Sequence, residues 1–305
     1  MSHLDKYRGI IPAFYAAYDE EGNISPERIE ELAKHYLEVG VKGLYVGGSS
    51  GECIYQSIDE RKLVLESVMK AVGGKMTIIA HIAAPSTRDS VELAKHAADL
   101  NVDALAAIPP IYFKLPESSI EKYWTDIVEA TDKDFFIYNI PATTGYSLSP
   151  ALYGKMLEHP QVVGVKNSSA PIQDVFLLRK AETKESIIFY GVDEQYLGGK
   201  AMGADGGIGG TYGVMPKLFL KLDAAFDNGE VKLAKELQAK ITDIIFKMLV
   251  LDGNLYDIMK QIIKINSDIN IGRVRGPLAL SSEADVYEIG VIAKLIREAE
   301  EKYCQ

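Results

Sequence analysis

The sequence is poor in cysteine, has no long apolar run and carries no excess of positive charge. Its two cysteines, Cys53 and Cys304, lie far apart in a chain of 305 residues, which excludes a disulfide framework and favours the cytoplasm. Acidic residues outnumber basic ones by 43 to 33, so the formal net charge is −10. An acidic surface repels nucleic-acid phosphates. No run approaches the ~18 apolar residues of a membrane span, and the charged start MSHLDKYRGI is unlike a secretory signal. We therefore expect a cytoplasmic protein that binds neither nucleic acid nor a membrane.

The sequence also lacks the patterns of nucleotide and metal sites. It contains neither G-x-G-x-x-G nor G-x-x-x-x-G-K-[ST]. Its five histidines form no H-x-x-x-H or H-x-x-E-H pattern, and the cysteines have no partner at ligand spacing. We therefore expect no metal ion and no organic cofactor. His81 and Cys53 are interpreted as packing residues, with a role in a nearby site as the alternative for each.

What the sequence does contain is a regular alternation of short apolar runs and amphipathic segments. Hydrophobic residues make up 47% and charged residues 25% of the chain, as in ordinary globular proteins. Eight runs are predicted to be strands: 9–18, 43–48, 77–83, 104–112, 134–141, 162–169, 186–194 and 204–210. They are apolar on both faces, as expected for parallel strands that are covered on both sides. Segments 25–40, 58–74 and 86–101 have the periodicity of helices between them.

Eight strand–helix units favour an α/β fold of one kind, the (β/α)8 TIM barrel. An open doubly wound sheet is less favoured because it usually carries a glycine fingerprint after its first strand. The barrel accounts for residues 1–215. From Met215 onward the sequence is predicted to be helical throughout, with helices at 217–229, 230–250, 254–266 and 281–303. No linker precedes this part, so we interpret 216–305 as a helical extension packed on the barrel.

Barrel enzymes place their catalytic groups at the C-terminal ends of the strands, and this rule singles out Lys166. It ends the apolar strand Val162–Val165, where burial would lower its pKa and leave a neutral amine able to form a Schiff base with a ketone. The alternative is a lysine that extends from the barrel rim into water. Tyr138 ends the preceding strand and could move protons beside Lys166, or could simply be a packed aromatic residue.

Two further strand ends carry polar groups that could bind a substrate. In GGSSGE, the hydroxyls of Ser49 and Ser50 and the nearby backbone N–H groups could hold a carboxylate without a positive side chain. Most Gly/Ser turns are only turns, which is the simpler interpretation. Asp193 and Glu194 follow the seventh strand and could accept hydrogen bonds from a polyhydroxylated ligand, or could be solvated loop residues.

Together these residues resemble the N-acetylneuraminate lyase and dihydrodipicolinate synthase superfamily, the class I pyruvate-dependent aldolases built on a barrel. The resemblance spans essentially the whole chain, in the order and spacing of that family. It rests on GLYVGGSSGE (43–52), IPPIY (108–112), YNIPATTG (138–145), VVGVKNSS (162–169) and GADGGIGGTY (203–212).

The resemblance implies roles for individual residues. Lys166 would be the Schiff-base lysine, Tyr138 the proton shuttle, and Ser49 with Ser50 the carboxylate binder. Tyr112 matches a tyrosine that reaches across a dimer interface into the neighbouring site, which implies a homo-oligomer, a tetramer or a dimer.

The subfamily depends on a few positions. Dihydrodipicolinate synthases have an arginine where this chain has Thr143, and no residue near it in the sequence supplies that cation. GVDE within 191–194 is similar to the sialic acid lyases, which implies Gly191, Asp193 and Glu194 as ligands of the sugar tail. Ser168 falls where those lyases have a threonine or serine near the lysine. Gly210 departs from the serine that many lyases use to contact the tail.

The expected function is therefore reversible retro-aldol cleavage of sialic acid to pyruvate and N-acetylmannosamine. One alternative keeps the chemistry but changes the substrate, to another 2-keto-3-deoxy sugar acid or to dihydrodipicolinate synthesis. A second is a non-catalytic barrel that senses pyruvate or a sugar acid, against which the pairing of Lys166 with Tyr138 argues. A third is a metal-dependent barrel aldolase or hydrolase.

Overall fold

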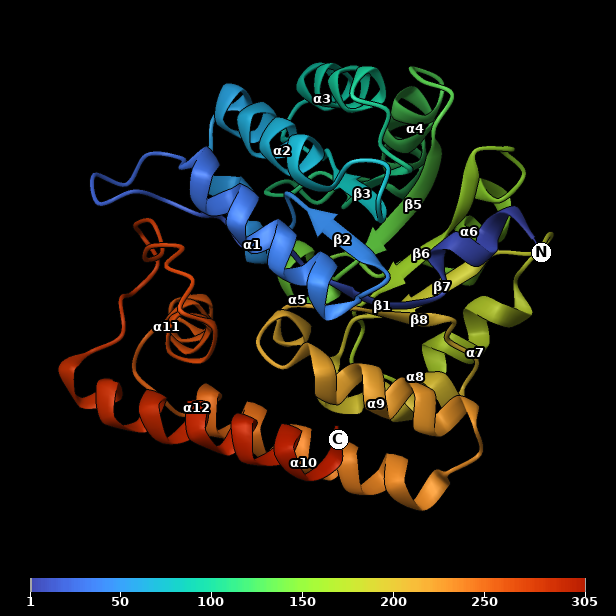
Figure 1. The fold of residues 1–305 in the computed structure, drawn as a ribbon. Coiled ribbons are helices and arrows are strands. Elements are labelled where there is room, and N and C mark those ends of the chain that lie inside the picture. Colours follow the sequence, from blue (N-terminus) through green and yellow to red (C-terminus); the bar gives the residue numbers. More distant parts are fainter. Residues whose placement is uncertain (1, 305) are drawn as a thin grey trace.

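The computed structural model describes residues 2–304, and its centre is a barrel of eight parallel strands (Figure 1). Neighbours along the sheet follow the order β1-β8-β7-β6-β5-β4-β3-β2. Between β1 and β2 the ring is joined by a bridge at Ala13 and Tyr45 and by a 2.9 Å bond from Phe14 N to Tyr45 O. The predicted (β/α)8 barrel is confirmed. The strands are β1 Gly9–Pro12, β2 Gly43–Val46, β3 Thr77–His81, β4 Ala104–Ala107, β5 Asp134–Asn139, β6 Val162–Asn167, β7 Ile187–Tyr190 and β8 Gly206–Gly209.

Helices surround the barrel, and the C-terminal ones form a layer along one side of it (Figure 1). None of the helices within residues 2–304 has the length and apolar character to cross a membrane. The helices are α1 Pro26–Val39, α2 Ile58–Val72, α3 Thr87–Asp99, α4 Glu117–Val128, α5 Pro141–Thr144, α6 Pro150–Met156, α7 Gln173–Lys180, α8 Tyr196–Ala201, α9 Pro216–Asp227, α10 Val231–Leu249, α11 Leu255–Ser267 and α12 Glu283–Tyr303.

Each predicted strand run contains one strand, but the strands are shorter than the runs. The extra residues form the loops at the C-terminal rim, and local chemistry ends the strands there. Pro109 and Pro110 follow β4 and have no N–H to donate to a neighbouring strand. Gly47 follows β2 with a φ of 77°, a left-handed conformation that turns the chain out of the sheet. Apolarity alone could not mark these ends.

The barrel has two apolar layers. Its interior is filled by side chains that alternate along the strands, among them Ile11, Ile79, Phe136, Phe189 and Ile208. The opposite faces of the same strands pack against the helices in a second, larger cluster. In β6 this alternation turns Lys166 toward the interior on the same side as Gly164, where a Cβ would lie 2.9 Å from the Phe136 ring.

The C-terminal part is helical, as predicted, except for one long segment. Helices α9 to α12 match the four predicted ranges closely. The prediction of helix throughout is wrong for residues 268–282, which form a loop after α11 ends at Asp268 with a left-handed φ of 59°. Helix α9 follows β8 and packs on β1 as well as on α10. The division at residue 215 into a barrel and an extension stays a prediction.

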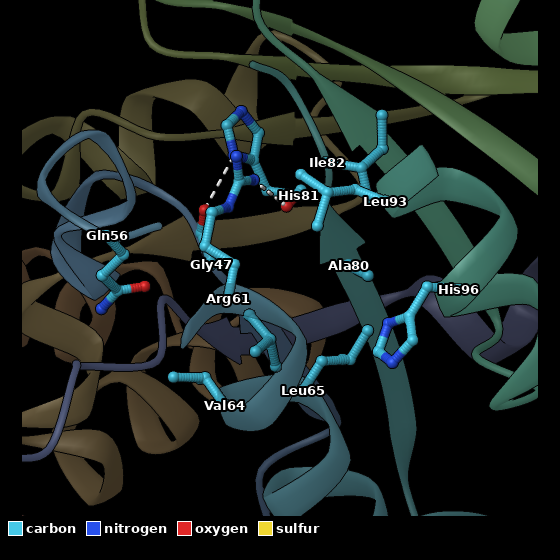
Figure 2. A pocket seen from close by; sticks show the side chains of 11 residues that line it. Gly47, Gln56, Arg61, Val64, Leu65, Ala80, His81, Ile82, Leu93 and His96 are labelled. Atoms are coloured by element: carbon cyan, nitrogen blue, oxygen red, sulfur yellow. Dashed lines mark hydrogen bonds between the residues drawn. The ribbon is translucent and has the colours of Figure 1, made fainter. Parts of the chain in front are cut away.

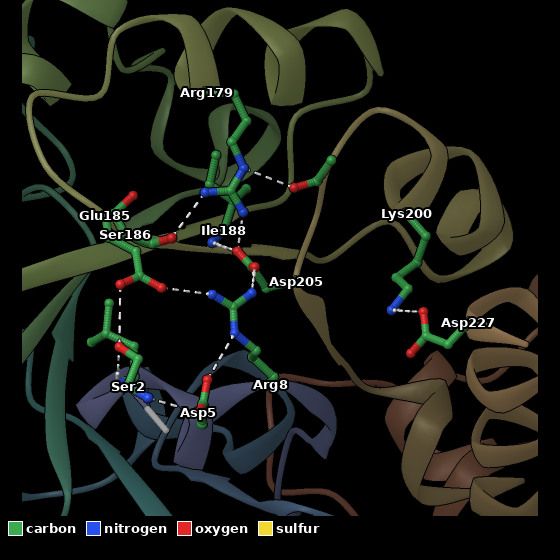
Figure 3. Close-up of polar contacts among 12 residues, drawn as sticks. Ser2, Asp5, Arg8, Arg179, Glu185, Ser186, Ile188, Lys200, Asp205 and Asp227 are labelled. Carbon is green, nitrogen blue, oxygen red and sulfur yellow. Dashed lines mark hydrogen bonds and ion pairs between the residues drawn. The ribbon is translucent and has the colours of Figure 1, made fainter.

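An ion network ties together the elements at the opposite, N-terminal rim (Figure 3). Asp205 precedes β8, and its carboxylate contacts Arg8, which precedes β1, and Arg179 on α7. The same carboxylate accepts a 2.8 Å bond from the N–H of Ile188 in β7. The side chain of Asp205 is only 7% exposed, so this network joins three neighbouring strands in a largely desolvated place.

We expect Asp205→Ala to lower the free energy of unfolding by about 3 kcal/mol, because it leaves two arginines without their shared carboxylate. The matched control is Glu185→Ala, which removes a partner of Arg8 that is 57% exposed and should cost less than about 1 kcal/mol. Urea unfolding followed by circular dichroism at one protein concentration measures both. Equal losses would contradict a central role for Asp205.

Candidate active site

Lys166 and Tyr138 meet at the C-terminal rim, as expected from adjacent parallel strands. Tyr138 of β5 and Lys166 of β6 are direct partners in the strand register. The Lys166 Nζ lies 3.7 Å from the centre of the Tyr138 ring and 4.7 Å from that of Tyr45. The ammonium group is therefore held between two phenol rings whose faces attract a cation.

The surroundings of Lys166 favour its neutral form. The residue is 4% exposed, and within residues 2–304 no carboxylate oxygen lies within 4 Å of its amine. Burial lowers the pKa of Lys166 to about 7, and the charge of Asp193 opposes this only in part. A large fraction of the amine is therefore unprotonated at neutral pH, which is what nucleophilic attack on a carbonyl requires. The interpretation of Lys166 as a solvated rim lysine does not fit this burial.

Tyr138 is protonated at neutral pH. Burial raises its pKa to about 12, while the side chains of Ser49 and Ser168 act in the opposite direction. Its hydroxyl can therefore donate a proton, or pass one on when a neighbouring group accepts it, but does not carry a standing negative charge. Ser168 Oγ is buried beside this hydroxyl, and no other hydrogen-bond partner is found for it among the described residues.

The Ser49–Ser50 turn lies directly after β2. Residues Ser49–Gly51 form the short 3-10 helix η2, in which Ser50 is buried and Ser49 half-buried. The turn approaches the barrel closely, since a Cβ on Gly48 would lie 2.7 Å from the Tyr45 ring. The turn is therefore built into the wall of the site rather than into a surface loop.

Asp193 lies in the short 3-10 helix Asp193–Gln195, and its side chain is held by hydrogen bonds from Thr211. Its Oδ2 accepts bonds from the backbone N (2.8 Å) and the hydroxyl (2.7 Å) of Thr211, just after β8. Burial raises the pKa of Asp193 to about 6, which these bonds and Lys166 oppose. Glu194 is half-buried beside it. Asp193 is thus a charged neighbour of the lysine as well as a candidate acceptor for substrate hydroxyls.

Two glycines in the predicted site are positions where a side chain would collide. A Cβ on Gly191 would lie 2.2 Å from Ser168 Oγ. A Cβ on Gly210 would lie 3.0 Å from Ser50 Oγ and 3.4 Å from the Met259 methyl group. A serine at Gly210 would therefore be tight against the Ser50 hydroxyl, which would have to shift by a few tenths of an ångström.

Tyr112 is not brought into the site of its own chain. Its side chain is 93% exposed, and its backbone has a φ of 87°, a conformation that a bulky residue rarely adopts. Its ring lies against that of Phe113, which is 72% exposed. The predicted role of Tyr112 in a neighbouring subunit stays a prediction.

Sequence reasoning missed two aromatic residues that lie at the site. Tyr45 contacts Lys166 and has a buried hydroxyl with no partner among the described residues. Its inward position in β2 could have been inferred from strand alternation. Tyr256 of α11 lies beside Ser50; burial raises its pKa and the Ser50 side chain opposes this. No local pattern in the sequence could place a residue so far along the chain in this site.

His81 and Arg61 form a buried layer below the site (Figure 2). His81 Nδ1 bonds to Gly47 O at 2.8 Å, and burial lowers the pKa of His81 to about 3, so it is the neutral, satisfied histidine that was predicted. Arg61 donates to the backbone oxygens of His81 and Ala83, at 2.8 and 2.7 Å, beside a cavity of about 20 Å³. Cys53 is only half-buried, and burial raises the pKa of its thiol. Among residues 2–304 no group of three or more His, Cys, Asp or Glu could hold a metal ion.

A cavity of about 550 Å³ opens beside the turn. Its lining includes Ser49, Arg61, Thr143 and Tyr256, together with apolar residues that follow β3 and β4. No residue close to Thr143 in the sequence supplies a cation. In the fold, however, Arg61 lines the same cavity as Thr143. Its guanidinium is largely occupied by backbone oxygens, however, and is not a free substitute for the synthase arginine.

Comparison with known proteins shows the family of this chain. The model of the dihydrodipicolinate synthetase family matches residues 6–295. The chain belongs to this family. It is 51% identical to the N-acetylneuraminate lyase of Mediterraneibacter gnavus, over 99% of this chain and 96% of that protein. Its identity to the N-acetylneuraminate lyase of Rhizobium meliloti is 35%, over 82% and 84% of the two chains.

Solved structures give the same result for the fold of this family member. The wild-type sialic acid aldolase of Ruminococcus gnavus superposes with a TM-score of 0.96 at 51% identity, covering 98% of this chain and all of that one (100%). A second structure of that aldolase, with its catalytic lysine mutated, gives a TM-score of 0.97 at 50% identity, over 99% and 100% of the two chains. The resemblance inferred from the sequence motifs is confirmed.

We expect the amine of Lys166 to become reactive between about pH 6 and 8, as it loses its proton around a pKa of about 7. Brief acetylation with dilute acetic anhydride, followed by mass spectrometry of the Lys166 peptide, measures this reactivity, with exposed Lys232 as the internal reference. Asp193→Asn should move the midpoint to lower pH, because the charge that raises the pKa of Lys166 is lost. Glu194→Gln is the control and should leave it in place. A midpoint near 10 in the unmodified protein would contradict the assignment.

Proposed function

We propose that this chain is an N-acetylneuraminate lyase, a class I aldolase that reversibly cleaves sialic acid to pyruvate and N-acetylmannosamine through a Schiff base on Lys166. The observation that carries the chemistry is the lysine itself, buried between two phenol rings with a pKa of about 7. The substrate is supported by the 51% identity to a lyase of that name over nearly the whole chain.

In the proposed reaction the amine of Lys166 attacks the ketone carbon of open-chain N-acetylneuraminate. Loss of water gives a protonated imine, which can accept an electron pair. Tyr138 acts as a relay: it receives the proton of the hydroxyl next to the bond that breaks as it passes its own proton to the substrate carboxylate, directly or through a Ser49 or Ser50 hydroxyl. The carbon–carbon electrons move into the imine to form an enamine, and N-acetylmannosamine leaves as the aldehyde. Protonation of the enamine carbon and hydrolysis of the imine then release pyruvate and restore the amine.

The remaining residues are proposed to bind the two ends of the substrate. Ser49 and Ser50 would hold the carboxylate, which suits a protein with a net charge of −10 because hydroxyls and backbone N–H groups do the binding. The sugar tail would lie along Ser168, Gly191, Asp193, Glu194 and Gly210. The position of Ser168 beside the Tyr138 hydroxyl supports its place in the site.

We further propose that the enzyme works in the cytoplasm as a homotetramer, with pyruvate and sugar acids as its only partners. The exposed aromatic pair Tyr112 and Phe113, whose ring centres are 4.9 Å apart, supports an interface at the β4 loop. In such an assembly Tyr112 would act at the site of the neighbouring subunit.

A second candidate is the same chemistry on another 2-keto-3-deoxy sugar acid. Gly210 favours it, because one hydroxyl that could bind the tail of sialic acid is missing and a lost hydrogen bond costs about 1 kcal/mol. Dihydrodipicolinate synthesis is less favoured, since Thr143 stands in place of the arginine of that reaction.

Borohydride reduction in the presence of pyruvate tests the mechanism, and we expect a reduced pyruvate adduct on the peptide that contains Lys166. Lys166→Ala should abolish both the adduct and turnover, and Tyr138→Phe should lower kcat by about 100- to 10,000-fold. Pyruvate release from N-acetylneuraminate, compared with a panel of 2-keto-3-deoxy acids, tests the substrate. An unmodified Lys166 peptide would reject the Schiff base, and faster release from another acid would favour the second candidate.

A further inference from the structure

Glu52 places a negative charge beside the turn that is proposed to bind the substrate carboxylate, and it lines the same cavity as Ser49. It follows directly after the Ser49–Gly51 turn and is only 1% exposed. Its backbone has a left-handed φ of 53°, and its N–H closes the turn by bonding to Ser49 O at 3.0 Å. A carboxylate this close in a desolvated wall would repel a second carboxylate strongly unless its charge were cancelled.

Lys260 supplies the cancelling charge from a distant part of the chain. Its Nζ lies 2.6 Å from Glu52 Oε1, and both side chains are fully buried, with 0% exposed. The other carboxylate oxygen accepts a 2.8 Å bond from the N–H of Arg275, in the loop after α11. Lys260 also donates to Arg273 O at 2.9 Å. Every strong contact of the Glu52 carboxylate therefore comes from residues 260–275.

The same face of α11 also lies against the turn. Tyr256, one helical turn before Lys260, approaches Ser50, and Met259, the residue directly before Lys260, approaches Gly210. A displacement of Lys260 would therefore shift the surface on which the turn rests.

We propose, on the basis of the function above, that Lys260 is a positioning residue for the substrate carboxylate. It neutralises Glu52 and holds the Ser49–Ser50 turn in the orientation that binds this group. Lys260 does not touch the reacting atoms. Its loss should therefore weaken binding of an acidic substrate much more than it slows the chemistry at Lys166.

A purely structural role for the pair is the competing explanation. Buried ion pairs are weak contributors to stability, because the cost of removing two charges from water offsets their attraction. A structural role would also affect every ligand of the site equally, whereas the positioning role distinguishes ligands that carry a carboxylate from ligands that do not.

Borohydride trapping on Lys166 with pyruvate and with its neutral methyl ester tests the proposal on the full-length enzyme. For Lys260→Met we expect the pyruvate concentration that gives half-maximal trapping to rise about tenfold. The reason is that the hydrogen bonds from the Ser49–Ser50 turn to the charged carboxylate of pyruvate become weaker. The corresponding value for the ester, and the maximal trapping rates, should change less than about threefold. Lys260→Arg and the double variant Glu52→Gln with Lys260→Met should restore most of the pyruvate binding, since neither leaves an uncompensated charge.

The matched control is Lys200→Met, which removes another buried lysine from an ion pair, with Asp223 at 2.9 Å, on a different helix (Figure 3 shows Lys200 beside Asp227). This variant should leave the half-maximal trapping concentrations of pyruvate and of its methyl ester unchanged. If Lys260→Met does not reach the native oligomer, Lys260→Gln is measured in the same way. Equal losses for pyruvate and its ester, or no recovery in the double variant, would overturn the positioning role. Failure of the wild-type enzyme to be trapped by either ketone would reject the Schiff base and this inference together.

Discussion

The burial of one ammonium group, that of Lys166, is the constraint on which the site depends. The difference between its ordinary pKa of 10.5 and about 7 corresponds to a penalty of about 5 kcal/mol for the charged form, at ~1.4 kcal/mol per pKa unit. Burial of the amine maintains this penalty, and no carboxylate within residues 2–304 forms an ion pair with it. Asp193 reduces it from a distance, and Thr211 holds Asp193 in place. Four strands, β2, β5, β6 and β8, thus determine the reactivity of one amine.

The barrel could be predicted from the sequence because its signal is local and repeated. Each strand is apolar on both faces, and helices such as Pro26–Val39 carry their own start and stop signals, Ser25 and Gly40. The path of the loop at 268–282 could not be predicted in the same way. Gly272, Gly276 and Pro277 indicate a break between the helices, but the path is held by Asp257 of α11, which binds Arg273, Val274 and Ser281. Those contacts exist only after the chain has folded.

In the site, too, residues with a local sequence signal could be predicted and residues placed by distant contacts could not. Lys166, Tyr138, Ser49 and Asp193 follow apolar strands, so strand alternation and the barrel rule place them together at one rim. Tyr256 and Lys260 are absent from that prediction because α11 belongs to no strand–helix unit of the barrel. Its position depends on packing against α10 and α12, which carries no local sequence signal. Gly210, which looked like a simple loss in the sequence, lies in the fold where a Cβ would be tight against Ser50 Oγ.

The bond between Glu52 and Lys260 joins residues 208 positions apart, and this has a consequence for how the protein is made. A ribosome synthesises the eight strands well before it reaches α11. Until Lys260 and Arg275 emerge, the nascent barrel has to keep the Glu52 side chain in water, because burying a carboxylate without a partner is strongly unfavourable. The wall of the site can therefore close only late in synthesis.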